Sequence, residues 1–90
     1  MSLENDYINL INEILAKQSL ILGPDIVRLK AKNVNGLKVS DQCKVESLTG
    51  DQQEVLQALI DQYISLSGQI VKNILNPVFA KYPEIKVNLK

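Results

Sequence analysis

Residues 49–76 read TGDQQEVLQALIDQYISLSGQIVKNILN, and this stretch decides the fold. Asp51, followed three residues later by Glu54, matches the spacing of a helix capping box, although Ser or Thr is the usual first residue. The apolar residues that follow recur every three to four positions, as they do on one face of a helix. The stretch therefore predicts a long helix that begins at Gln52 and continues at least to Asn76.

Two positions weaken this helix. Pro77 lacks an amide hydrogen, so we expect a kink or an interruption there if the helix continues to Lys81. Gly68, preceded by Ser65 and Ser67, is a second weak point. Small residues let two helix backbones approach, so these three positions predict either a close helix crossing, which we favour, or a bend.

The apolar side chains of this helix cover an arc of about 200° at 100° per residue, which is wider than one neighbouring helix covers. The helix would be about 37 Å long, against about 22 Å for the helix predicted near the N-terminus. We therefore expect part of it to overhang its own domain and to bind a second copy of the chain. The predicted interface residues are Leu59, Tyr63, Leu66, Ile70 and Ile74. In the alternative, the chain covers the whole arc itself and is a monomer.

Two shorter helices are predicted ahead of the long one. Residues 3–17 place their apolar side chains on one face, and this helix is expected to end near Gln18, a polar residue that would rotate into that face. Gly23-Pro24 predicts the start of the second helix, because proline is favoured in the first helical turn. The second helix is expected to end near Asn33.

Residues 37–39 and 43–48 alternate weakly between apolar and polar side chains, which predicts a short β-hairpin. Residues 83–90 alternate as well, and they are either a third strand or an exposed tail. The fold class predicted is mainly α, a single domain over residues 1–90. It combines two shorter helices, one long helix and the hairpin, and it pairs as a dimeric helical bundle.

The composition excludes several classes of protein. The chain has 90 residues, in which ten Lys and Arg balance ten Asp and Glu, and it has no histidine. Histidine is the commonest general base and metal ligand, so we expect no enzyme, no metal site and no cofactor. The single cysteine, Cys43, excludes an internal disulfide and makes a cytoplasmic location the default. No apolar run is long enough for a membrane span, and no signal peptide is recognised.

Three local features have both a functional and a structural interpretation. Cys43 beside Lys44 is either a reactive thiol or an ordinary turn residue, and we favour the second. Gly23-Pro24 could offer free amides to an anion, but the start of a helix explains it better. A basic cluster could contact phosphates, yet a nucleic-acid binder of this size is usually strongly basic, whereas this chain is neutral. The cluster comprises Arg28, Lys30, Lys32, Lys38 and Lys44.

Residues 21–24, Ile-Leu-Gly-Pro, and residues 50–56, Gly-Asp-Gln-Gln-Glu-Val-Leu, resemble small helical modules of bacterial signalling proteins. The resemblance identifies no family and transfers no functional residue. We expect a non-enzymatic interaction module that self-associates through its long helix, with another protein as a further candidate partner. The alternatives are a small-molecule binding protein with an apolar pocket between helices, and a nucleic-acid accessory protein.

Overall fold

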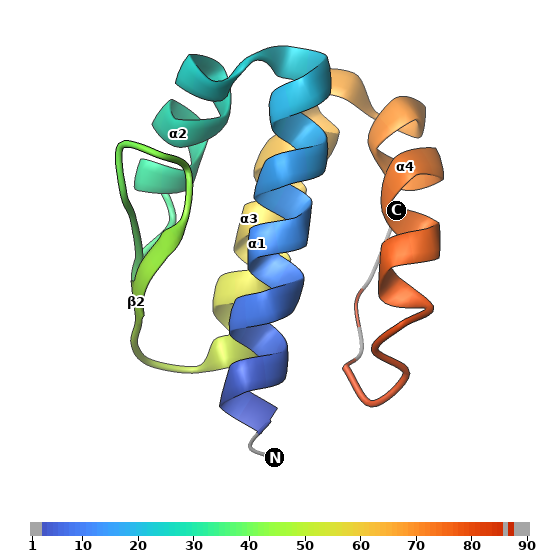
Figure 1. The fold of residues 1–90 in the computed structure, drawn as a ribbon. Coiled ribbons are helices and arrows are strands. Elements are labelled where there is room, and N and C mark those ends of the chain that lie inside the picture. The colour runs from blue at the N-terminus through green and yellow to red at the C-terminus, as the bar shows by residue number, and fades with distance from the viewer. Residues whose placement is uncertain (1–2, 86, 88–90) are drawn as a thin grey trace.

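The computed structural model describes residues 3–85 and 87, which form four helices and one antiparallel hairpin (Figure 1). In chain order, the elements are α1 (Leu3–Leu22), α2 (Pro24–Lys32), β1 (Leu37–Val39), β2 (Val45–Leu48), α3 (Gln52–Ser67) and α4 (Gln69–Phe79). The prediction of a mainly helical chain with a hairpin is confirmed.

The helix α1 lies at the centre of the arrangement. It packs against α2, α3, α4 and β2, with α2 and the hairpin on one side of it and α4 on the other (Figure 1). Its 20 residues give a length of about 30 Å at 1.5 Å per residue, close to the longest dimension of the chain, 31 Å. The longest dimension of the folded chain is therefore set by the length of α1.

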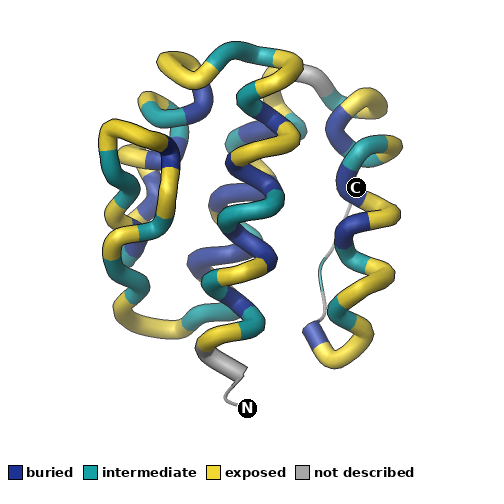
Figure 2. The backbone as a smooth tube through the Cα atoms, in the orientation of Figure 1, coloured by how far each residue is buried: buried dark blue, intermediate teal, exposed yellow. Residues whose placement is uncertain are grey.

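All four helices contribute side chains to the core, and Figure 2 shows their buried turns in dark blue. The large, fully buried side chains are Leu10, Ile11, Ile14, Leu15 and Gln18 of α1, Val27 of α2, Leu56, Leu59, Ile60 and Tyr63 of α3, and Val71 and Leu75 of α4.

The predicted start of two helices is confirmed. At the head of α3, one carboxylate oxygen of Asp51 accepts hydrogen bonds from the backbone amides of Gln53 at 2.9 Å and Glu54 at 3.2 Å. These amides have no partner within the helix, so the carboxylate satisfies them. Pro24 occupies the first turn of α2.

The end of α1 differs from the prediction. The helix extends to Leu22 instead of ending near Gln18. Gln18 remains helical with its side chain fully buried, and the chain turns only at Gly23, whose φ is 88°. Glycine adopts such a positive φ without the steric cost that a side chain imposes.

The single long helix from Gln52 was a wrong prediction, because the chain bends at Gly68. The structure thus shows the bend that was the alternative there to the favoured close crossing. This residue has φ 51° and ψ −111°, so α3 ends before it and α4 begins after it. Pro77 lies in the last turn of α4 and does not divide it. The expected overhang is absent among the described residues, because α4 turns back and packs against α1 and α3 (Figure 1).

The hairpin is tied to the central helix. Leu37 of β1 pairs with Leu48 of β2, and the backbone amide of Val45 donates to Asn12 Oδ1 of α1 at 2.8 Å. Residues 83–85 form a turn, and the described part of the tail contains no third strand. The remainder of the predicted strand, residues 86 and 88–90, lies outside the described residues.

We predict that Gly36→Ala destabilises the fold far more than Gly50→Ala. Both glycines have positive φ, 89° and 80°, but a Cβ at Gly36 would collide with the carbonyl oxygen of Thr49, whereas Gly50 has nothing nearby. The left-handed backbone alone costs an alanine roughly 1–2 kcal/mol, and displacement of a packed neighbour adds about 1–3 kcal/mol. Urea unfolding measures both variants, and equal losses of stability would contradict the close packing at Gly36.

Candidate functional site

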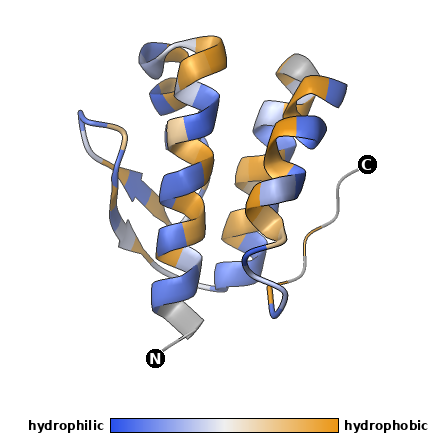
Figure 3. Ribbon diagram, turned by 45° about the vertical axis from the view of Figure 1, so that its right-hand side comes forward, coloured by the Kyte–Doolittle hydropathy of each residue, from blue (hydrophilic) through white to orange (hydrophobic). Residues whose placement is uncertain are grey.

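Large hydrophobic side chains remain exposed at one end of the helical bundle. We call six of them the apolar end: Leu20 and Ile21 of α1, Ile26 and Leu29 of α2, Leu66 of α3 and Ile70 of α4. The last turn of α1, α2 itself, the last turn of α3 and the first turn of α4 all lie at the top of Figure 1. Figure 3 shows hydrophobic colour extending to these upper helix ends. Leu20 is 85% exposed, the highest value among the six.

Part of the apolar end is free of charge. Residues 18–24 and residues 62–71 contain no charged side chain, although 22% of the whole sequence is charged. At that frequency a stretch of ten residues would carry about two charges. Four of the six apolar-end residues fall in these two segments, which are far apart in sequence and meet only in the folded chain. The other two, Ile26 and Leu29, lie on α2 beside Asp25, Arg28 and Lys30, so charged side chains border this part of the apolar end.

Two single-residue connections explain why this end is uncovered. Gly23 alone joins α1 to α2, and Gly68 alone joins α3 to α4. Both glycines have positive φ, so the chain reverses without a loop. Because there are no loop residues to lie over the helix ends, the apolar side chains of the last turns face solvent.

The predicted interface residues differ in how far the structure buries them. Leu59 and Tyr63 are fully buried in the chain's own core, so this fold does not offer them to a partner. Leu66 and Ile70 are 44% and 54% exposed, and both belong to the apolar end, while Ile74 is half-buried. The bend at Gly68 places Ile70 and Ile74 on a separate helix, whereas Leu66 stays on α3 and is exposed in its last turn.

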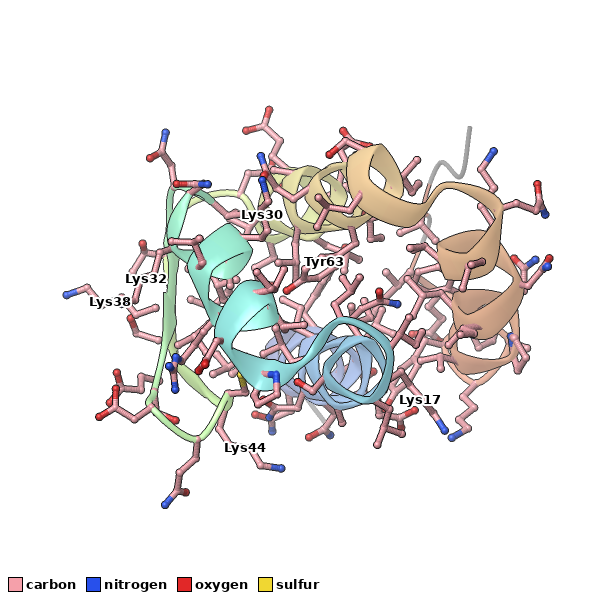
Figure 4. The ribbon with its side chains drawn as sticks, turned by 90° about the horizontal axis from the view of Figure 1, so that it is seen from above. Lys17, Lys30, Lys32, Lys38, Lys44 and Tyr63 are labelled. Carbon is pink, nitrogen blue, oxygen red and sulfur yellow. The ribbon has the colours of Figure 1, made fainter. Side chains whose placement is uncertain are left out.

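Tyr63 has a structural role. Its ring lies among the helices (Figure 4), and its hydroxyl donates to the backbone carbonyl of Val27 at 3.1 Å. This bond ties α3 to α2 directly beneath the apolar end. Burial, with a smaller contribution from Cys43, raises the pKa of the Tyr63 hydroxyl far above its usual value of 10.0, so it remains a neutral donor.

Sequence reasoning did not find Leu20, Ile21, Ile26 and Leu29. Leu20 and Ile21 lie beyond the expected end of the first helix, and Ile26 and Leu29 lie in the predicted second helix, for which no exposed apolar face was predicted. The absence of charge from residues 18–24 and 62–71 was a signal for the four apolar-end residues in these segments, but not for Ile26 and Leu29.

Gln18 is a buried polar side chain without a partner. It is fully buried, and among the described residues neither its amide nitrogen nor its amide oxygen has a hydrogen-bond partner. It continues the buried face of α1 one turn beyond Ile14 and Leu15. An amide in this state reduces stability, because it loses its bonds to water without replacement.

The reactive interpretation of Cys43 is not supported by its position. The thiol is buried and donates to the backbone carbonyl of Pro24 at 3.4 Å. Cys43 itself has φ 59°, an unusual value for a residue with a side chain. The contact holds the hairpin turn against the start of α2 and covers the sulfur.

The basic cluster does not form one surface. Arg28 forms an ion pair with Asp25 at 2.9 Å and donates to the carbonyl oxygen of Asp41 at 2.7 Å. In Figure 4, Lys30 lies toward α3, Lys32 and Lys38 lie on the outer side of the hairpin, and Lys44 lies on a different side of it. This spread does not present a row of phosphate contacts to nucleic acid.

A solvent-open crevice of about 440 Å³ lies beside α3, between this helix and two loops. Its lining comes from residues 33–36, residues 49–51 and one face of α3 with Glu54, Ala58 and Gln62. This is within the usual size of a small-molecule site. It differs from the predicted apolar pocket between helices, because amide and carboxylate side chains form much of its rim.

In comparisons with known proteins, no family, no curated protein and no solved structure matches the chain. Among the described residues, no group of three or more Cys, Asp or Glu side chains could hold a metal ion, and no helix has both the length and the apolar character of a membrane span.

We predict that Gln18→Met raises the free energy of unfolding by about 1–3 kcal/mol, because it replaces an unsatisfied amide with an apolar side chain of similar length. Urea denaturation measures the change. Gln62→Met is the matched control, since Gln62 is only half-buried, and it should change stability by less than about 0.5 kcal/mol. A loss of stability in Gln18→Met would instead mean that the amide has a partner in solution.

Proposed function

We propose that this protein is a non-enzymatic interaction module that self-associates by covering its apolar end. The observation that carries the proposal is the set of six exposed hydrophobic side chains, four of which lie in helix-end segments without a charged residue. Contiguous exposed apolar surface on a small protein commonly marks a contact site. The non-enzymatic part of the proposal, and a cytoplasmic location, depend on the sequence alone, with no histidine and one cysteine.

A second copy of the chain is the partner that best fits this surface. The uncharged segments 18–24 and 62–71 are compatible with their own copies, because a two-fold contact between them brings no like charges together. A partner with a charged surface would lose hydration without gaining an ion pair.

The amount of apolar surface is consistent with a dimer that forms reversibly. The six exposed fractions together equal about three fully exposed aliphatic side chains. Burial of both copies' surfaces would contribute roughly 9–18 kcal/mol, at about 1.5–3 kcal/mol for each side chain. Association itself costs an estimated 4–15 kcal/mol. We therefore expect self-association that depends on concentration.

The crevice beside α3 supports small-molecule binding as a second candidate function. It has a suitable volume, and the buried side chains of Val34 and Val55 contribute to its lining. Its acidic residues are Asp51, whose carboxylate is already used to cap α3, and Glu54. Nothing on its rim specifies one ligand chemistry, so self-association remains the first candidate.

We predict that Leu66→Glu combined with Ile70→Glu gives a folded monomer. Both side chains are about half exposed in the folded chain, so their replacement removes little of the core. Four buried carboxylates in a dimer interface would oppose association strongly. Light scattering after size exclusion, over a hundredfold range of concentration, measures the mass, and circular dichroism measures the fold.

Ala16→Glu is the control for this experiment. Ala16 is exposed on α1 but does not belong to the apolar end, so this variant should associate like the unmodified chain. An unmodified chain that remains monomeric at every concentration would overturn the proposal, and so would a double variant that dimerises as the unmodified chain does.

A further inference from the structure

The bend between α3 and α4 depends on a single residue. The backbone amide of Gly68 donates to the carbonyl oxygen of Ile64 at 2.8 Å, and the amide of Lys72 donates to the carbonyl oxygen of Gly68 at 3.2 Å. Helical hydrogen bonding therefore reaches Gly68 from both sides, and only its φ of 51° and ψ of −111° separate the two helices. A change in these two angles would join α3 and α4 into one helix.

The apolar residues are spaced as they would be in one continuous helix through Gly68. Helical spacing of apolar residues continues through Gly68, so Leu66 and Ile70, four residues apart, would lie on one face of a straight helix. In the bent chain, these two residues lie on either side of the hinge and are exposed. The bend thus leaves uncovered the two side chains that a straight helix would place together.

The contacts of α4 do not require it to belong to the same chain. It packs against α1 and α3, and beyond its end Lys81 Nζ lies 3.2 Å from Glu13 Oε2 of α1. The Tyr82 hydroxyl donates to the other carboxylate oxygen of Glu13 at 3.4 Å. These residues are nearly 70 positions apart and Gly68 alone joins α4 to α3, so the α4 of a second copy can make the same contacts once that connection straightens.

From these observations we infer that two copies associate by exchanging α4. In each copy α3 and α4 straighten at Gly68, and α4 packs on α1 of the partner, so the contacts of the bent chain are kept across the interface. The two straight helices run past each other at Gly68, where the missing side chain allows a close approach, and Leu66 and Ile70 become buried between them. This inference rests on the proposed self-association and states how the second copy is held.

A cross-linking experiment tests the exchange in the unmodified chain. Light and ¹⁵N-labelled chains are mixed in equal amounts, unfolded, refolded together and treated with a water-soluble carbodiimide, which joins the amine and the carboxylate of an ion pair. Lys81–Glu13 is the lysine–carboxylate ion pair found among the described residues. Trypsin then releases the linked peptides 1–17 and 73–86 for mass spectrometry. With exchange, half of the linked peptides from the dimer fraction should join a light and a heavy partner.

The outcomes separate the two proposals. Absence of a dimer at any concentration overturns self-association and exchange together. A dimer whose linked peptides are all light–light or heavy–heavy leaves self-association in place and overturns exchange. Lys81→Arg is the control, because arginine keeps the positive charge but does not couple to the activated carboxylate, so the linked peptides should disappear.

A hinge variant provides the second test. Gly68→Ala should lower the dissociation constant of the dimer on the order of 30-fold, because alanine favours a continuous helix over glycine at both hinges of the dimer. Gly23→Ala is the matched control, since Gly23 is also a single-residue connection with positive φ and open space around it. An equal shift in both variants, or no shift in Gly68→Ala, would overturn the assignment of Gly68 as the hinge.

Discussion

The buried face of α1 is the constraint on which the rest of the structure depends. The helices α2, α3 and α4 and the strand β2 all pack against this one helix, and its length sets the length of the molecule. Each of these elements covers part of a face that is apolar from Tyr7 to Leu15 and continues through Gln18. A chain of 90 residues has few apolar side chains beyond those that its core needs. The arrangement of the fold is therefore decided by which segment covers each part of α1.

The same constraint explains why one end of the bundle is left open. Helices that pack back along α1 must reverse direction close to its end, and the chain does this with a single glycine at residue 23 and again at residue 68. Such tight reversals bring the uncharged segments 18–24 and 62–71 to the same end and leave no loop to cover them. The most compact way of connecting the helices therefore exposes the apolar side chains on which the proposed function depends.

Much of the fold could be predicted from local signals in the sequence. The capping carboxylate of Asp51, the proline that opens α2 and the alternation in the hairpin each act over a few residues, and each prediction is confirmed. The bend at Gly68 was one of the alternatives that the sequence left open, because Gly68 and Pro77 are both helix breakers and packing of α4 against α1 decides between them. For the same reason, the sequence did not distinguish Leu59 and Tyr63, which the core uses, from Leu66 and Ile70, which it leaves exposed.

The buried thiol of Cys43 can report local unfolding of the segments that cover it. Its thiol is the single one in the sequence, and it is covered between the hairpin turn and the start of α2. An alkylating reagent can reach the sulfur only when these two segments part, so the rate of modification under native conditions reports the free energy of that opening. This side of the bundle lies across α1 from α4 (Figure 1), so the probe follows the stability of the α2–hairpin half separately from events at Gly68.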